Sequence, residues 1–190
     1  IRSRLVGSEM CIRDSVIIGS SILVLVVVAL DILKVIFIGD PEYWQAMYIV
    51  PIILLANFCL GIYQNLSVWY KVTDMTKFAA YISVVGATIT LLLNIILIPN
   101  YSFLWSAVAT LIAYLTMALL SYSIGKKYYP IPYNASKILF YILLSISLSS
   151  ISFYGFRDNI LVGIACIMVM NLVILVKEKR QIIKLFNLIR

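Results

Sequence analysis

The run VIIGSSILVLVVVALDILKVIFI, residues 16–38, is long and apolar enough to cross a membrane as a single helix. A hydrocarbon core about 30 Å thick needs about 20 helical residues. Five further apolar runs follow, separated by short polar segments. Strands of a membrane barrel would alternate apolar and polar residues, and this alternation is absent. The sequence therefore predicts an all-α integral membrane protein with six transmembrane helices, at residues 16–38, 46–69, 78–98, 102–124, 138–156 and 160–176.

Positive charge falls on alternate polar segments. The second, fourth and last segments hold ten Lys and Arg residues, whereas the other three hold one. In chain order, the six segments are residues 39–45, 70–77, 99–101, 125–137, 157–159 and 177–190. Because Lys and Arg are retained on the cytoplasmic side during insertion, we expect a multi-pass protein with both ends in the cytoplasm.

The composition excludes several classes of protein. The hydrophobic fraction is 63% and the mean hydropathy is +1.05, far above the values of soluble domains. The net charge of +7 is typical of loop anchors beside anionic headgroups, so we expect no nucleic-acid partner. The chain has no His, and Cys11, Cys59 and Cys166 show neither metal-ligand nor disulfide spacing. We therefore expect no enzyme activity, no cofactor and no metal site.

The two ends of the chain differ from the apolar runs. The first 15 residues show no helical apolar period, and the string SRLVGSEMCIRDS at residues 3–15 resembles translated adaptor sequence. We interpret residues 1–15 as a non-native, adaptor-like leader, with a signal peptide as the alternative. Residues 16–176 then form the six-span bundle, as the C-terminal part of a longer protein. Residues 177–190 form a basic amphipathic cytoplasmic tail, which lies in the membrane interface or is a frayed end.

Two charged residues interrupt the apolar runs. Asp31 and Lys34 lie three residues apart in the first run, so they share a helix face and can pair. A charge at the centre of a span costs about 2.5–3.5 kcal/mol on insertion scales, and such residues often mark substrate or ion pathways. The functional interpretation is a polar lining that meets a charged cargo or a coupling ion. The structural alternative is an ion pair near the outer interface, with Lys34 extended toward water.

Amides gather in the second apolar run. Asn57 and Gln64 are seven residues apart, and Asn65 is eight residues from Asn57, which places the three along one side of a helix. Such a side suits a hydrated cavity whose amides hydrogen-bond sugar hydroxyls. Helix–helix hydrogen bonding is the alternative, and in membranes it is usually worth less than about 2 kcal/mol. Pro51 can kink this helix.

Five short passages stand in a fixed order in the middle of the chain. They are EYW at 42–44 followed by an apolar run with Pro51, GIYQNLSVWYK at 61–71, LNIILIP at 93–99, SAVATLI at 106–112 and KYYPIPY at 127–133. With this order and spacing, residues 40–133 resemble polysaccharide or O-antigen exporters of the multidrug/oligosaccharidyl-lipid/polysaccharide superfamily. The family usually has G-x-x-G-A after the Ile-Pro, whereas this chain has Ser102 and Trp105 at the two glycine positions.

The resemblance implies two six-helix bundles, of which this chain would be roughly the C-terminal one. It implies a flippase that moves a lipid-diphosphate-linked oligosaccharide, an O-antigen or capsule-type repeat unit, across the bacterial inner membrane by alternating access. The partners would be that glycolipid, membrane lipids and the missing N-terminal half of the same protein. The side chains that would bind substrate in the cavity are Asp31, Lys34, Asn57, Gln64 and Asn65. Those that would bind the diphosphate headgroup at the cytoplasmic entrance are Lys71, Lys77, Lys126 and Lys127.

Three other classes of function stay open, and one of them is a structural or scaffolding membrane protein. A small-molecule or cation antiporter of the same superfamily would be expected to carry several membrane acids, and only Asp31 is available here. A membrane-embedded glycan polymerase or acyltransferase normally needs a His, an acid pair or large outer loops, and this chain has no His and short loops.

Overall fold

The chain is helical throughout the part that the computed structural model describes, apart from short turns. That part is residues 2–37, 44, 47–101, 104–128, 135–156 and 159–189. Its helices are α1 (Arg2–Phe37), α2 (Val50–Leu66), α3 (Val68–Val72), α4 (Lys77–Tyr101), α5 (Leu104–Tyr128), α6 (Ala135–Ser150), the π-helix η2 (Ile151–Gly155) and α7 (Ile160–Ile189).

The six predicted spans are confirmed. Segments long and apolar enough to cross a membrane are Ile12–Ile36, Met47–Lys71, Lys77–Pro99, Leu104–Tyr128, Ser136–Gly155 and Ile160–Lys179. The second of them includes both α2 and α3. The fold class is therefore an all-α, six-span membrane protein.

Pro51 stands at the start of α2 and not at a kink. It occupies one of the first two positions of this helix. A proline there lacks only an amide that has no partner within the helix, and its fixed φ suits the first turn. The expectation that Pro51 can bend the span is therefore not met, because the helix begins beside it.

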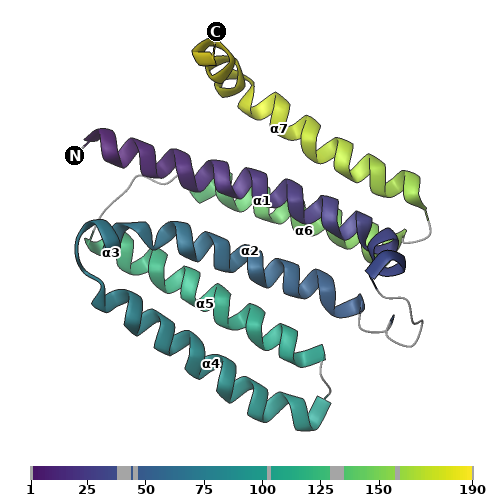
Figure 1. Cartoon of the computed structure of the whole chain (residues 1–190), viewed down its shortest axis with the longest axis horizontal. Helices are drawn as coiled ribbons and strands as arrows, with labels where there is room; N and C mark the ends of the chain where they lie inside the picture. The colour runs from purple at the N-terminus through teal and green to yellow at the C-terminus, as the bar shows by residue number, and fades with distance from the viewer. Residues whose placement is uncertain are drawn as a thin grey trace.

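Consecutive spans run in opposite directions (Figure 1). The beginning of α1, the turn between α3 and α4, the end of α5 and the end of α7 therefore lie at one end of the bundle. We call this the basic end, because the lysines outside the first span whose side chains are described are found here: Lys71, Lys77, Lys126, Lys127, Lys137, Lys177 and Lys179. The alternating charge predicted this grouping, and the placement of the basic end in the cytoplasm stays a prediction.

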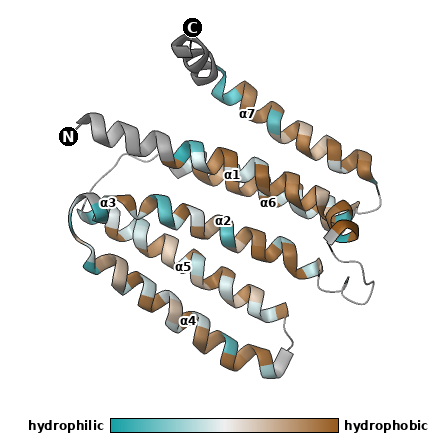
Figure 2. Ribbon diagram, in the orientation of Figure 1, coloured by the Kyte–Doolittle hydropathy of each residue, from teal (hydrophilic) through white to brown (hydrophobic). Residues whose placement is uncertain are grey.

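The helices lie side by side in an order different from their order in the chain. α4 packs on α5, α5 on α2, and α2 on α1, while α6 and α7 both pack against α1 (Figure 1). Large apolar side chains cover much of the outer surface, for example Leu161, Ile95 and Val35, and apolar colour runs along every span in Figure 2. A surface of this kind is suited to contact with lipid.

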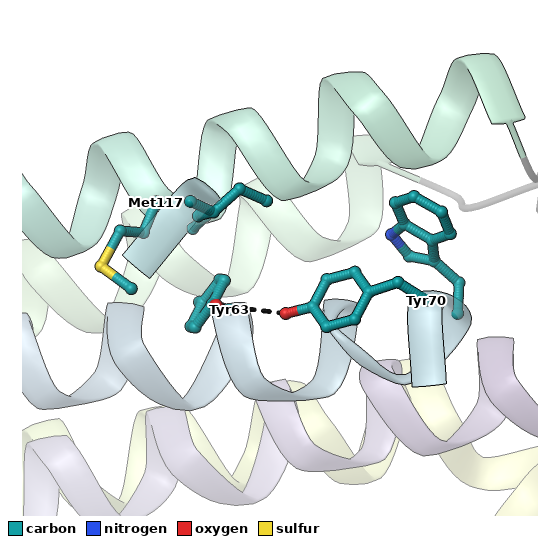
Figure 3. Packing of buried hydrophobic residues seen from close by; sticks show 6 residues of the cluster. Tyr63, Tyr70 and Met117 are labelled. Atoms are coloured by element: carbon teal, nitrogen blue, oxygen red, sulfur yellow. Dashed lines mark hydrogen bonds between the residues drawn. The ribbon is translucent and has the colours of Figure 1, made fainter. Parts of the chain in front are cut away.

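One buried cluster joins α2, α3, α4 and α5. It includes Tyr63, Trp69, Tyr70, Ile82 and Met117, and Figure 3 shows Tyr63 and Tyr70 with their hydroxyl groups directed toward each other. A second cluster joins α1, α6 and α7 through Val16, Val24, Tyr141, Cys166 and Met170. A third joins α1 and α2 to η2, through Leu23, Val27, Leu30, Met47 and Phe153. The two halves of the bundle thus have separate cores that meet at α1 and α2.

Two helices extend past the boundaries that the sequence suggested. α1 runs without a break from Arg2 past residue 15, through a stretch where no helical period was found, and Ile12 is 2% exposed. The interpretation of residues 1–15 as a non-native leader stays a prediction. α7 continues to Ile189 as one helix, but the side chains of residues 180–190 lie outside the described ones.

Candidate functional site

Asp31 and Lys34 form an ion pair on α1. The Lys34 Nζ donates to Asp31 Oδ1 at 2.6 Å, and it also lies 5.1 Å from the centre of the Trp44 ring. The Asp31 side chain is 37% exposed and the Lys34 side chain is 19% exposed. Their position near the end of α1 places them at the end of the bundle opposite the basic end (Figure 1). The pairing that the three-residue spacing predicted is therefore present.

A cavity of about 180 Å³ opens beside Asp31. Its walls come from α1, η2 and the beginning of α7, and its polar groups are Asp31, Ser152 and Asn159. Gly163 forms part of the wall, and a Cβ there would lie 2.6 Å from Val28 Cγ1, so the glycine allows α7 to approach α1 closely. One carboxylate with hydroxyl and amide neighbours can exchange a proton or hydrogen-bond a polar ligand.

The cavity lies next to a π-helical turn. α6 changes to the π-helix η2 at Ile151, and Ser152, Phe153 and Phe156 line the same cavity as Asp31. Single π-turns in otherwise α-helical segments are found frequently at functional sites, because they redirect side chains and carbonyl groups. The sequence did not predict this turn, and nothing in the serine-rich run before it distinguishes a π-turn from an α-turn.

The three amides of α2 separate into two groups. Asn57 and Gln64 are exposed, whereas Asn65 faces α1, where its Nδ2 donates to Ser15 Oγ at 2.8 Å and to Gly61 O at 3.0 Å. Asn65 thus makes the helix–helix bond that was the alternative interpretation. It does not share a side with the other two, because each residue of an α-helix turns the side-chain direction by about 100°.

An open groove of about 280 Å³ lies between α1 and α2. Asn57 lines it together with Ser15, Gly19 and Gly61. The Asn57 Nδ2 donates to Ile53 O at 3.0 Å, which leaves its carbonyl oxygen available to accept a bond from the groove. Nothing lies within 4 Å of the position that a Cβ on Gly61 would take. The groove is therefore accessible to a ligand at the depth of the spans.

The four lysines predicted to bind a headgroup are all exposed at the basic end. Lys71 lies in the last turn of α3, Lys77 begins α4, and Lys126 and Lys127 lie in the last turn of α5. Trp69 stacks on Tyr128 with ring centres 6.5 Å apart, and the Lys127 Nζ lies 5.9 Å from the centre of the Tyr128 ring. Four positive charges from three helices thus lie at one end of the bundle, which suits an anionic headgroup. The structure does not bring them together with Asp31, which lies at the opposite end.

One buried acid was not among the predicted site residues. Glu178 on α7 is 6% exposed, and its Oε1 accepts a hydrogen bond of 3.3 Å from the Tyr141 hydroxyl on α6. Its neighbours Lys177 and Lys179 made it look like part of a solvated tail. Its spacing gave no clear signal, because Cys166 and Glu178 are twelve residues apart and their directions on an α-helix differ by about 120°.

Within the described residues, no group of three or more Cys, Asp or Glu side chains is arranged to hold a metal ion. No protein-family model, curated protein or solved structure matches this chain. The resemblance to exporters therefore stands on the quoted passages alone. What the six apolar helices establish is a multi-pass membrane protein.

Proposed function

We propose that this chain is the C-terminal bundle of a flippase that moves a lipid-diphosphate-linked oligosaccharide across the bacterial inner membrane. The observation that carries the proposal is the exposure of Asn57 and Gln64 on an apolar span, where Asn57 also lines an open groove. Amides at membrane depth normally face a partner helix or a hydrated cavity, because lipid tails offer no hydrogen bonds. A sugar chain supplies many hydroxyl groups for such amides.

The other charged groups fit the same transport cycle. The lysines of the basic end would attract the diphosphate headgroup from the cytoplasmic leaflet, while the groove would receive the sugars. A second bundle, the missing N-terminal half, would cover the exposed side of α1 and α2 and complete the cavity. The chain itself would perform no covalent chemistry and need no cofactor.

The test uses the full-length protein that would contain this bundle. Asn57 and Gln64 are both replaced by Leu, and lipid-linked oligosaccharide is measured on the two leaflets. We expect the glycolipid to accumulate on the cytoplasmic leaflet, with less glycan at the cell surface. Asn171→Leu is the matched control, since Asn171 is an exposed amide on α7 that accepts a 3.5 Å bond from Ser21 Oγ of α1 and does not line the groove. Normal surface glycan in the Asn57/Gln64 variant would remove the groove from the function.

A cation-coupled antiporter for small molecules is the second candidate. The cavity at Asp31 favours it, because a membrane acid with polar neighbours is typical of ion-coupled transport. The two candidates differ in cargo: an antiporter would change the resistance of cells to small toxic cations and leave the lipid-linked oligosaccharide unaffected.

A further inference from the structure

A row of polar side chains follows the buried face of α6. The described side chains of α6 that are buried are Tyr141, Ser145 and Ser149, each four residues from the next, and Ser152 of η2 continues the row. Residues four apart lie on one helix face. This face packs against α1 and α7, and we call the region between the three helices the seam. The α6 side of the seam carries these hydroxyl groups, whereas α1 and α7 contribute mainly apolar side chains such as Val16, Val24 and Met170.

Contacts between the helices place these groups at successive levels. A Cβ on Gly163 would lie close to Val28 of α1 and 3.7 Å from Ser152 Oγ, which fixes the level nearest Asp31. Ser149 lines a small cavity together with Leu23 of α1. Tyr141 belongs to one cluster with Val16 and Val24 of α1, and Ser20 lies between these two valines in the sequence of α1. From Asp31 toward the basic end, the row on η2 and α6 is therefore Ser152, Ser149, Ser145 and Tyr141, and Tyr141 bonds to Glu178.

Two hydroxyls in the seam have no hydrogen-bond partner among the described residues. They are Ser20 Oγ, on a residue with 0% exposure, and Ser149 Oγ, on a residue with 7% exposure. Buried polar groups are almost always satisfied by protein or by water. The cavity beside Ser149 has a volume of about 100 Å³ and lies between α1, α2 and α6, and it is far larger than one water molecule requires. Ser149 therefore borders room for internal water on the side of α2, and both hydroxyls have unmet hydrogen-bonding capacity.

An acid stands at each end of this row. Asp31 borders the larger cavity that also contains Ser152, and Glu178 accepts its bond from Tyr141. A membrane acid of this kind is a functional site by default. The two acids lie at opposite ends of the spans, so the row between them crosses the hydrocarbon region.

Glu178 forms no ion pair within the described residues. The ion pairs found there are Arg13–Asp14 and Lys34–Asp31. On α1, Arg13 is close enough to Tyr141 to interact electrostatically, but it bonds to Asp14. On α7 itself, Lys177 lies over the Phe140 ring at 3.3 Å and Lys179 is exposed. On α6, Lys137 is exposed as well.

We propose that the seam conducts protons between Asp31 and Glu178. A proton binds the Asp31 carboxylate and gives the neutral acid, which releases Lys34 from the ion pair. It then passes along the serine hydroxyls and internal water, where each oxygen accepts one proton and releases another. It reaches the Glu178 carboxylate and leaves at the basic end. One proton crosses and no covalent bond other than O–H changes. The conduction requires only this chain and does not depend on the transport of a glycolipid.

The test reconstitutes the full chain in lipid vesicles that contain a pH-sensitive dye, with a potassium diffusion potential as the driving force. We expect proton flux above that of protein-free vesicles. Asp31→Asn, Glu178→Gln and the double variant Ser20→Ala/Ser149→Ala should each reduce the flux to the protein-free rate. Ser147→Ala is the matched control on α6, since Ser147 is exposed and its Oγ donates to Leu143 O at 2.8 Å; its flux should equal that of the wild type.

Thermal unfolding in detergent separates lost conduction from lost folding. The serine double variant removes two small hydroxyls that bond to no described residue, so it should unfold at the temperature of the wild type. The serine double variant therefore tests whether the seam conducts protons even where an acid variant fails to fold. Wild-type flux equal to that of protein-free vesicles overturns the proposal. Undiminished flux in the serine double variant overturns it too, as does a current carried by sodium without protons.

Discussion

The hydroxyl of Tyr70 donates a hydrogen bond of 3.1 Å to the hydroxyl of Tyr63, across the junction where α2 gives way to α3 (Figure 3). Both side chains are buried, at 1% and 8% exposure. Ser67 lies between the two helices, and its Oγ donates to Gln64 O. The tyrosine pair therefore holds the end of the second span against α5 where the regular helical ladder changes.

Replacing Tyr70 by Phe should destabilise the bundle by about 1 kcal/mol, because the Tyr63 hydroxyl is then left buried without its partner. Thermal unfolding in detergent measures the change. The double variant Tyr63→Phe/Tyr70→Phe should be less unstable than the sum of the single variants predicts, since neither hydroxyl remains. Strictly additive effects would mean that the bond contributes nothing.

Gly163→Ala should weaken the contact between α1 and α7. A Cβ at this position would lie 2.6 Å from Val28 Cγ1, and overpacking of a close contact costs about 1–3 kcal/mol. Gly61→Ala is the control, because no atom lies within 4 Å of the added methyl group and Ala favours helix over Gly by about 1 kcal/mol. We expect a lower unfolding temperature for the first variant and an equal or higher one for the second. Equal temperatures for Gly163→Ala and the wild type would contradict the close packing of α7.

Lys71→Gln and Lys77→Gln should together lower glycan export in the full-length protein. Each lysine near an anionic surface contributes about 1 kcal/mol, so losing one should weaken headgroup binding about fivefold. Surface glycan and the cytoplasmic pool of lipid-linked oligosaccharide measure the effect. Lys179→Gln serves as the control, since Lys179 is exposed at the same end but on α7. Unchanged surface glycan in the double variant would exclude these lysines from headgroup binding.

A reporter active only outside the cytoplasm should be active when fused after Tyr101 and inactive when fused after Lys127. Tyr101 ends α4 at the end away from the lysines, and Lys127 lies at the basic end. The difference follows from retention of Lys and Arg in the cytoplasm. The reverse activities would invert the whole topology, since the spans alternate in direction.

The spans were predictable because the hydropathy of a span depends on the composition of about 20 consecutive residues and not on contacts with other helices. The same holds for the ion pair of Asp31 and Lys34, whose spacing alone brings them together. The side that each amide of α2 faces was harder to predict. Gln64 and Asn65 are adjacent in sequence, and only the position of α1 shows that Asn65 is the one in the helix contact.

The seam was not predicted, for a related reason. Ser145, Ser149 and Ser152 look like ordinary small residues of a span, and their importance depends on α1 and α7 packing over them. Glu178 was assigned to the tail because its two neighbours are lysines, although α7 turns its side chain inward to Tyr141. Long-range packing of this kind is not contained in the local pattern.

The close pairing of α4 and α5 has a consequence for how the chain enters the bilayer. Only residues 102–103 separate the two helices, and no charged residue occurs between Lys77 and Lys126. The tip of this hairpin can therefore cross the hydrocarbon core without carrying an ion through it, whereas the tip between α6 and α7 must take Arg157 and Asp158 across. We expect α4 and α5 to enter as one unit, halted when the lysines at both of its open ends reach the anionic headgroups.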